Sequence, residues 1–315
     1  MFLPEIKSNA GEDICILFKV DNYAGNFICE CGDASELTVK DCQATEAIFI
    51  SHTHIDHFVN FDFILRHQIG IQKRIVICGP TGITQQVQSK IRAYQWNLIE
   101  EGSIIYEIRE IVDKRTILQS EIKPPHWAID PIESNPLSSL YSNEKFTVDF
   151  EILDHKTPSI AYLFKEADSV KIDMSKSEFK GGSWIRALKE AFEAGDDERM
   201  LTVVEQEWQA KDLYHLLEIK KGDSLGVIMD HAAHEENHER IARLFKDCNQ
   251  VFIECFYKLA DKEQAIKNYH SYSEASARIM KRCQVKKATP VHFSRKYDEE
   301  EIQVLLEEFY AELGS

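Results

Sequence analysis

Short apolar runs rich in β-branched residues recur along the whole chain, and polar residues, glycine or proline bound each of them. Runs of this length and composition predict β-strands. The expected strands are residues 14–20, 26–29, 47–50, 74–78, 104–111, 146–153, 160–164, 225–229, 251–254 and 287–291. Because strands come first and helical patterns follow, the chain predicts an α/β fold in which two sheets pack face to face and are covered by helices.

Helical patterns are clearest in two places. Near the C-terminus, an apolar face lies among acidic residues and is formed by Ile302, Leu305, Leu306, Phe309 and Leu313. Residues 176–222 are also helical in pattern, at 184–188 and again at 208–219. We therefore expect a single domain over residues 1–315, with a helical insertion at about 176–222.

The composition is that of an ordinary globular protein, with 315 residues, of which 43% are hydrophobic and 29% charged. The first residues show neither a basic segment nor a long apolar run, and no stretch reaches the roughly 18 apolar residues of a membrane span. The eight cysteines include no C-x-x-C pair and are interpreted as small buried hydrophobic residues. These features predict a cytoplasmic protein with no membrane partner.

The formal net charge of −16 argues against a protein whose affinity depends on many phosphate contacts. A protein with this charge would need a local basic patch, or bound metal ions that contact the phosphates, to bind a nucleic acid. The candidate patch flanks one strand near the C-terminus and consists of Arg282, Lys286, Lys287, Arg295 and Lys296. An ordinary solvated face is the alternative interpretation.

A dense set of metal-ligand side chains follows the predicted strand 47–50, in the sequence SHTHIDH of residues 51–57. Alternate residues of an extended chain project to the same side, so we expect His52, His54 and Asp56 to converge, with His57 next to them. Two imidazoles can then bind one metal, and a carboxylate with a third imidazole can bind another. A simple polar turn is the alternative, but histidines rarely fall this close together by chance.

These loop residues cannot complete two metal coordination shells, so further ligands are expected at other strand ends. His155 follows the predicted strand 146–153, Asp230 follows 225–229, and His292 follows 287–291. Each is a ligand-type residue at the end of an apolar run, which supports one shared site.

Several motifs then occur in a fixed order along the chain. They are FICECGD at 27–33, LDHKTPSIAY at 153–162, VFIEC at 251–255, YHSYSEA at 269–275 and VHFSRKY at 291–297. Together with SHTHIDH, this order resembles the metallo-β-lactamase superfamily and, within it, the ribonuclease Z branch. The resemblance implies the metallo-β-lactamase αββα sandwich, in which two packed mixed β-sheets are covered by helices.

The resemblance also implies a site for two divalent metal ions. One would be held by His52, His54 and His155, the other by Asp56, His57 and His292, with Asp230 bridging both. Zn²⁺ is the expected metal, and Mn²⁺ or Fe are the alternatives. Such cations lower the pKa of bound water to about 7, which makes it a nucleophile at neutral pH.

Three residues are implied in catalysis: Asp56, which is also a ligand, His270 and Glu254. His270 would lie opposite the metals and stabilise phosphoryl oxygens or protonate the leaving oxygen, with Glu254 orienting it. The alternatives are an ordinary surface histidine for His270 and a structural cap or ion pair for Glu254.

The chain departs from the branch at several positions. Glu30 stands where the branch usually has Asp, and Asp230 is followed by His231 instead of the more usual Thr. His234 and His238 are four residues apart and could bind a metal on a helix, although a solvated helix face among glutamates is the preferred interpretation.

The leading function is a metal-dependent hydrolase, a phosphodiesterase resembling ribonuclease Z, the endoribonuclease that processes the 3′ ends of precursor tRNA. One alternative is a hydrolase of a small substrate such as a cyclic nucleotide, thioester or lactone, and another is a metal-binding scaffold without catalysis. Precursor tRNA as a partner conflicts with residues 176–222, the expected substrate-holding arm, which contain more acidic than basic residues. A homodimer is implied by the resemblance.

Overall fold

The computed structural model describes residues 1–132 and 139–314, which form two compact units. The main unit contains residues Met1–Lys165 and continues at Ser224, and the inserted unit is Glu166–Asp223. None of the helices within the described residues has the length and apolar character needed to cross a bilayer.

The first sheet of the main unit has eight strands, which neighbour one another in chain order. They are β1 (Phe2–Ile6), β2 (Ile16–Val20), β3 (Asn26–Cys29), β4 (Thr45–Phe49), β5 (Lys73–Pro80), β6 (Ile104–Ile111), β7 (Ile117–Lys123) and β8 (Ala128–Pro131). Strands β3 to β6 run parallel to one another, and the strands outside them pair antiparallel.

The second sheet has six strands in the order β18-β17-β16-β11-β10-β9. Their bounds are β9 (Tyr141–Ser142), β10 (Phe146–Asp154), β11 (Pro158–Glu166), β16 (Ser224–Ile228), β17 (Gln250–Glu254) and β18 (Lys287–Val291). The last three are parallel, and their carboxyl ends therefore meet at one edge of the sheet.

The two sheets pack face to face over a core of buried aromatic side chains. Phe18 and Phe27 come from the first sheet, and Phe146 and Phe164 from the second, and none is more than 2% exposed. The ring centroids of Phe18 and Phe164, one from each sheet, are 4.6 Å apart. Burial of such a ring stabilises the fold by about 1.5–3 kcal/mol.

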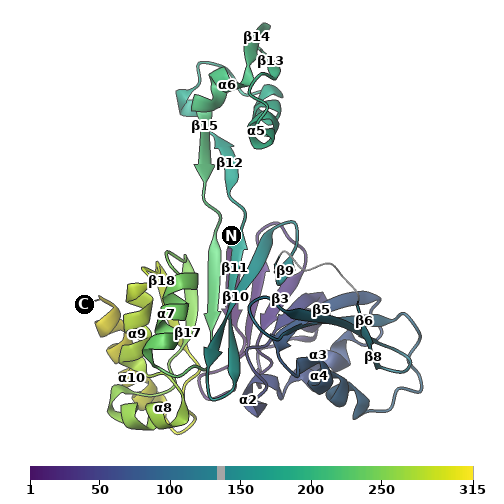
Figure 1. The fold of residues 1–315 in the computed structure, drawn as a ribbon, viewed down its shortest axis with the longest axis vertical. Helices are drawn as coiled ribbons and strands as arrows, with labels where there is room; N and C mark the ends of the chain where they lie inside the picture. Colours follow the sequence, from purple (N-terminus) through teal and green to yellow (C-terminus); the bar gives the residue numbers. More distant parts are fainter. Residues whose placement is uncertain (133–138, 315) are drawn as a thin grey trace. The chain divides into compact units, whose positions relative to one another are not determined.

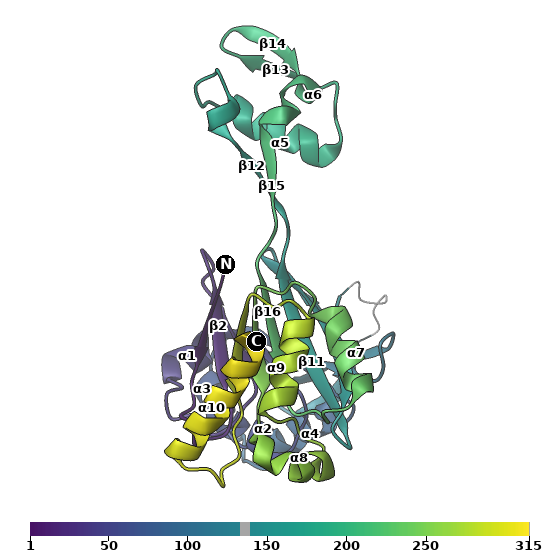
Figure 2. The same ribbon diagram turned by 90° about the vertical axis from the view of Figure 1, so that its left-hand side faces the viewer.

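Helices cover the outer face of each sheet (Figures 1 and 2). On the first sheet they are α3 (Phe61–Gln68) and α4 (Ile83–Arg92), and on the second α7 (Glu235–Leu244), α9 (Ser273–Arg282) and α10 (Glu299–Gly314). Shorter helices are α1 (Val39–Ala44), α2 (Ile55–Phe58) and α8 (Lys262–Asn268). In α10 the predicted apolar face is present, with Leu305 and Phe309 fully buried. The layer order confirms the predicted αββα architecture.

The inserted unit has its own small core and is a mixture of helices and strands. Its elements are β12 (Ser169–Ile172), α5 (Trp184–Ala194), β13 (Met200–Val203), β14 (Gln206–Gln209), α6 (Ala210–Leu213) and β15 (Leu217–Lys220). The helical pattern over 208–219 yields the short α6 and a 3-10 turn at Tyr214–Leu216, because Leu217–Lys220 pair with β12 as β15. The unit also begins at Glu166, before the predicted range of 176–222.

Candidate metal centre

The SHTHIDH segment begins in extended conformation and then turns into a helix. Strand β4 ends at Phe49, and His54 is the N-cap of the one-turn helix α2, which carries Asp56 and His57. The predicted alternation of side chains does not extend to Asp56 and His57, because both lie on this helix. His57 on α2 still lies beside His52, with the two ring centroids 4.2 Å apart.

A first group of ligand-type atoms comprises one atom each from His52, His54, His155 and Asp230, all within 4.8 Å of one another. Nε2 of His52 lies 3.7 Å from Oδ2 of Asp230, and Nε2 of His155 lies 3.4 Å from the same oxygen. Nε2 of His52 and Nδ1 of His54 are 2.9 Å apart. Three imidazoles and one carboxylate thus converge on a small volume.

A second group comprises Asp56, His57 and His292. It adjoins the other oxygen of Asp230, since Oδ1 lies 3.3 Å from Nε2 of His57 and 3.2 Å from Nδ1 of His292. Asp230 therefore faces one group with each of its two oxygens. The structure brings all seven predicted ligand residues into these two groups, and their role as ligands stays a prediction.

Unsatisfied polar atoms at this site fit bound cations. Nε2 of His57, Nδ1 of His292 and Oδ1 of Asp230 are buried and have no hydrogen-bond partner within the described part of the chain. Buried polar atoms without partners are rare, because each loses its hydration and gains nothing in return. A metal ion would provide the missing partner for all three atoms at once.

The electrostatics of the cluster are dominated by burial and by Asp230. Burial lowers the pKa of His52 to about 2, so this imidazole is neutral and its lone pair is free to bind a metal. Burial alone would raise the pKa of Asp230, but His292, His57 and His52 together hold it well below its usual range. The result is a carboxylate that stays ionised among imidazoles.

Two residues outside the cluster orient its histidines. Oε2 of Glu30 lies 3.0 Å from Nδ1 of His57, and both Oε1 and Oε2 also accept hydrogen bonds from Ser51. Nδ1 of His155 lies 2.6 Å from the backbone carbonyl oxygen of Tyr269. Since a carbonyl oxygen can only accept, His155 carries its proton on Nδ1 and presents Nε2 to Asp230.

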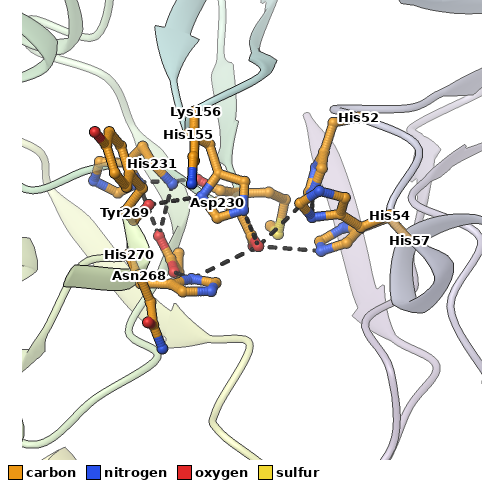
Figure 3. Close-up of polar contacts among 12 residues, drawn as sticks. His52, His54, His57, His155, Lys156, Asp230, His231, Asn268, Tyr269 and His270 are labelled. Carbon is orange, nitrogen blue, oxygen red and sulfur yellow. Dashed lines mark hydrogen bonds and ion pairs between the residues drawn. The ribbon is translucent and has the colours of Figure 1, made fainter. Parts of the chain in front are cut away.

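His270 and Glu254 form a hydrogen-bonded pair beside the cluster, and Figure 3 shows His270 next to Asp230. His270 Nδ1 contacts Oε1 of Glu254 and lies 3.6 Å from Oδ2 of Asp230. Oε2 of Glu254 accepts from the backbone amides of His231 and Ser271 at 2.9 and 3.3 Å. Burial lowers the pKa of His270, but the Glu254 carboxylate raises it to about 9, so the ring is protonated at neutral pH.

Sequence reasoning did not find the roles of Tyr269 and His231. Tyr269 contributes its backbone carbonyl, which every residue has, so the residue type does not indicate this role. The His231 side chain is fully buried, and its Nδ1 lies 2.9 Å from the Met229 carbonyl and 3.1 Å from Oε2 of Glu254. In the sequence, the position of His231 directly after Asp230 is the feature that could have indicated a role at the site.

The two candidate histidines on α7 do not join a metal group of the described residues. His234 caps the helix, and its Nε2 lies 3.2 Å from Oδ2 of Asp154. His238 is half-buried and so not on a fully solvated face, and this burial lowers its pKa to about 4.

The candidate basic patch is largely neutralised by carboxylates. Arg295 pairs with Asp13, Lys296 with Asp261, and Arg282 with Glu235.

Comparisons with known proteins agree with the fold. The chain is 26% identical to ribonuclease Z of Deinococcus radiodurans over 282 residues. The aligned region covers 86% of this chain and 82% of that protein. It is 25% identical over 284 residues to ribonuclease Z of Methanocaldococcus jannaschii, spanning 87% and 78% of the two chains. No protein-family model matches the chain.

Two solved structures are similar in fold. The short form of human tRNase Z has a TM-score of 0.58 at 14% identity, over 94% of both chains. The metallo-β-lactamase fold protein YhfI of Bacillus subtilis has a TM-score of 0.59 at 12% identity, over 100% of this chain and 94% of that one. This chain is a metallo-β-lactamase-fold protein related to ribonuclease Z, with a buried His/Asp cluster suited to binding metal.

Proposed function

We propose that this protein is a metal-dependent phosphodiesterase that cleaves RNA, with the 3′ end of precursor tRNA as its substrate. The observation that carries the proposal is the pair of ligand groups that share Asp230, with the His270–Glu254 pair alongside. The relationship to ribonuclease Z supports the substrate class.

The proposed metal site uses the residues of the two groups. His52, His54 and His155 hold one divalent cation, Asp56, His57 and His292 hold the other, and Asp230 contributes to both. Imidazole and carboxylate ligands suit Zn²⁺, and Mn²⁺ or Fe are accepted by the same donor set. When bound, two such cations supply a nucleophilic water and positive charge for the phosphoryl group.

The remaining chemistry belongs to His270. Its ring is protonated because the carboxylate of Glu254 raises its pKa to about 9 against the effect of burial. An imidazolium at this place can donate a proton to the leaving oxygen. Two backbone amides hold Glu254, so the pair is positioned before substrate binds. Glu254 thus acts as a positioning residue for His270.

A small phosphodiester is the second candidate substrate, favoured by the charge of the molecule. The net charge of −16 repels a polyanion at long range, and the inserted unit has no excess of basic residues. The basic patch near β18 is largely paired with carboxylates, so it does little to offset this repulsion. The metal site alone would then supply the affinity for phosphate.

One set of measurements tests both candidates. Metal analysis of the purified protein is expected to give close to two transition-metal ions per chain. The metal-loaded enzyme is then mixed with precursor tRNA, and the products are separated on a gel. A single cut at the 3′ trailer junction at low enzyme concentration supports the tRNA substrate. Turnover of a small diester without cleavage of precursor tRNA contradicts it. A loaded enzyme that hydrolyses neither contradicts the phosphodiesterase itself.

The relationship to ribonuclease Z further suggests a homodimer. Sedimentation equilibrium of the metal-loaded protein tests this, and a mass equal to the 36.4 kDa chain would contradict it.

A further inference from the structure

Two residues that neighbour site histidines have a backbone conformation that their side chains disfavour. Lys156 follows His155 and has φ of +61°, and Tyr269 precedes His270 and has φ of +60°. Glycine adopts this left-handed region without steric cost, whereas lysine and tyrosine do so only when the surroundings impose it. Strained residues of this kind concentrate at functional sites.

The two residues meet. The ammonium of Lys156 lies over the Tyr269 ring, 6.0 Å from its centroid, and the Tyr269 carbonyl accepts from His155. Figure 3 shows both residues on the same side of the cluster as His155. One contact therefore links the segment that carries His155 to the segment that carries His270.

The Lys156 side chain is exposed, and no carboxylate of the described residues forms an ion pair with it. Other cations near the site are neutralised, as Arg295 is by Asp13 and Lys296 by Asp261. In a chain of net charge −16, an unpaired ammonium beside a cluster that contains carboxylates is a local exception. Its hydrogen-bond donors remain available for an anion from solution.

We infer that Lys156 binds a phosphate of the substrate next to the scissile one, and that the Tyr269 ring limits where its ammonium can lie. The inference rests on the proposed phosphodiesterase function and specifies its substrate as an oligonucleotide. A lysine ammonium is a common phosphate ligand, and its contact with the ring leaves its N–H groups free. A diester without a neighbouring phosphate gains nothing from this residue, so Lys156 discriminates in favour of longer substrates.

Lys156→Ala tests the inference, because alanine disfavours the left-handed region as lysine does and lacks the side chain that carries the ammonium. Two measurements are made on metal-loaded protein: the Kd for a fluorescent single-stranded oligoribonucleotide, and kcat/KM for that oligonucleotide and for bis(p-nitrophenyl) phosphate. The oligonucleotide is expected to bind roughly 10- to 100-fold more weakly, as for one charge-assisted hydrogen bond. The slope of log affinity against log salt should also fall by about 0.7. Activity on the small diester should fall by much less than activity on the oligonucleotide.

Two further variants complete the test. Lys40→Ala removes an exposed lysine of α1 and should leave oligonucleotide binding unchanged, whereas Lys156→Arg should restore most of the affinity. Equal losses on both substrates, unchanged oligonucleotide affinity in Lys156→Ala, or no oligonucleotide binding by the wild type would each overturn the inference. Failure of the proposed function is distinguishable, because the wild type would then hydrolyse neither substrate while oligonucleotide binding still reports on Lys156.

Discussion

Oε2 of Glu30 lies 3.0 Å from Nδ1 of His57, and both side chains are fully buried. The pair fixes the orientation of the imidazole and leaves its Nε2 to face Asp230. Burial lowers the pKa of His57, but the carboxylates of Asp230 and Glu30 raise it well above its usual value. A carboxylate that hydrogen-bonds the ring nitrogen facing away from a metal increases the basicity of a ligand histidine.

Glu30→Gln should therefore weaken metal binding while keeping the shape of the side chain. We expect metal affinity to fall by about 10- to 100-fold, which is typical for the loss of such a partner. Competition with a chelator measures the affinity. Glu36→Gln, at an exposed position nearby in the chain, is the matched control and should have no effect. Equal affinities in the two variants would show that Glu30 is only structural.

Asp230→Ala should weaken metal binding by both groups, because each of its oxygens faces a different one. Elemental analysis of the purified variant is expected to show the loss of at least one metal ion per chain and a corresponding loss of activity. Asp21→Ala, a change at an exposed aspartate, should keep full occupancy. Retention of two metals by Asp230→Ala would contradict the bridging role.

His270→Ala should separate catalysis from metal binding. Since His270 is proposed as a proton donor and not as a ligand, the variant should keep its metal content. Its turnover of a phosphodiester should fall by roughly 10²- to 10⁴-fold, as for a lost general acid. Metal analysis and steady-state kinetics on the same preparation decide the point. Loss of metal together with activity would show that His270 belongs to the ligand set.

The pH dependence of activity should report on the His270–Glu254 pair. Burial lowers the pKa of His270, but Glu254 raises it to about 9, and only the protonated ring can donate a proton. Activity should therefore fall as pH rises through about 9. Glu254→Gln removes the charge that raises this pKa, so the fall should occur at lower pH. A pH–rate profile with the same alkaline limb in both proteins would exclude the pairing as its cause.

The turn that follows Glu30 requires glycine at position 32. A Cβ added to Gly32 would lie 2.5 Å from backbone atoms of Asp13 and Ile14, which cannot move without disturbing β2. Gly32→Ala should destabilise the fold by about 1–3 kcal/mol or more, as overpacking does. Gly11→Ala is the control, because nothing lies within 4 Å of a Cβ there. Thermal unfolding measures both, and equal midpoints would contradict the steric argument.

Much of the fold could be predicted from the sequence, because apolar periodicity reflects burial directly. The predicted strand at 104–111 has the bounds of β6, and that at 26–29 has the bounds of β3. The expected apolar face of α10 is buried in the hydrophobic cluster that covers the second sheet, where α10 packs against α9. Prediction was weakest over 208–219, where the pairing of β15 with β12 outweighs a helical pattern.

The convergence of ligand-type residues could likewise be inferred from their places at strand ends, since parallel strands bring their carboxyl ends together. His155, Asp230 and His292 lie where that argument puts them. The left-handed conformations of Glu30, Lys156, Tyr269 and His292 could not be inferred, because none is glycine.

The sequence therefore shows which residue types are available and at which strand ends they stand. The folded structure sets how these residues are oriented. It supplied the Tyr269 carbonyl for His155, the two backbone amides for Glu254, and the aromatic ring beside Lys156. These contacts join segments far apart in the chain, and the Tyr269 carbonyl and the amides that hold Glu254 are backbone groups, which every residue type shares and no sequence pattern records.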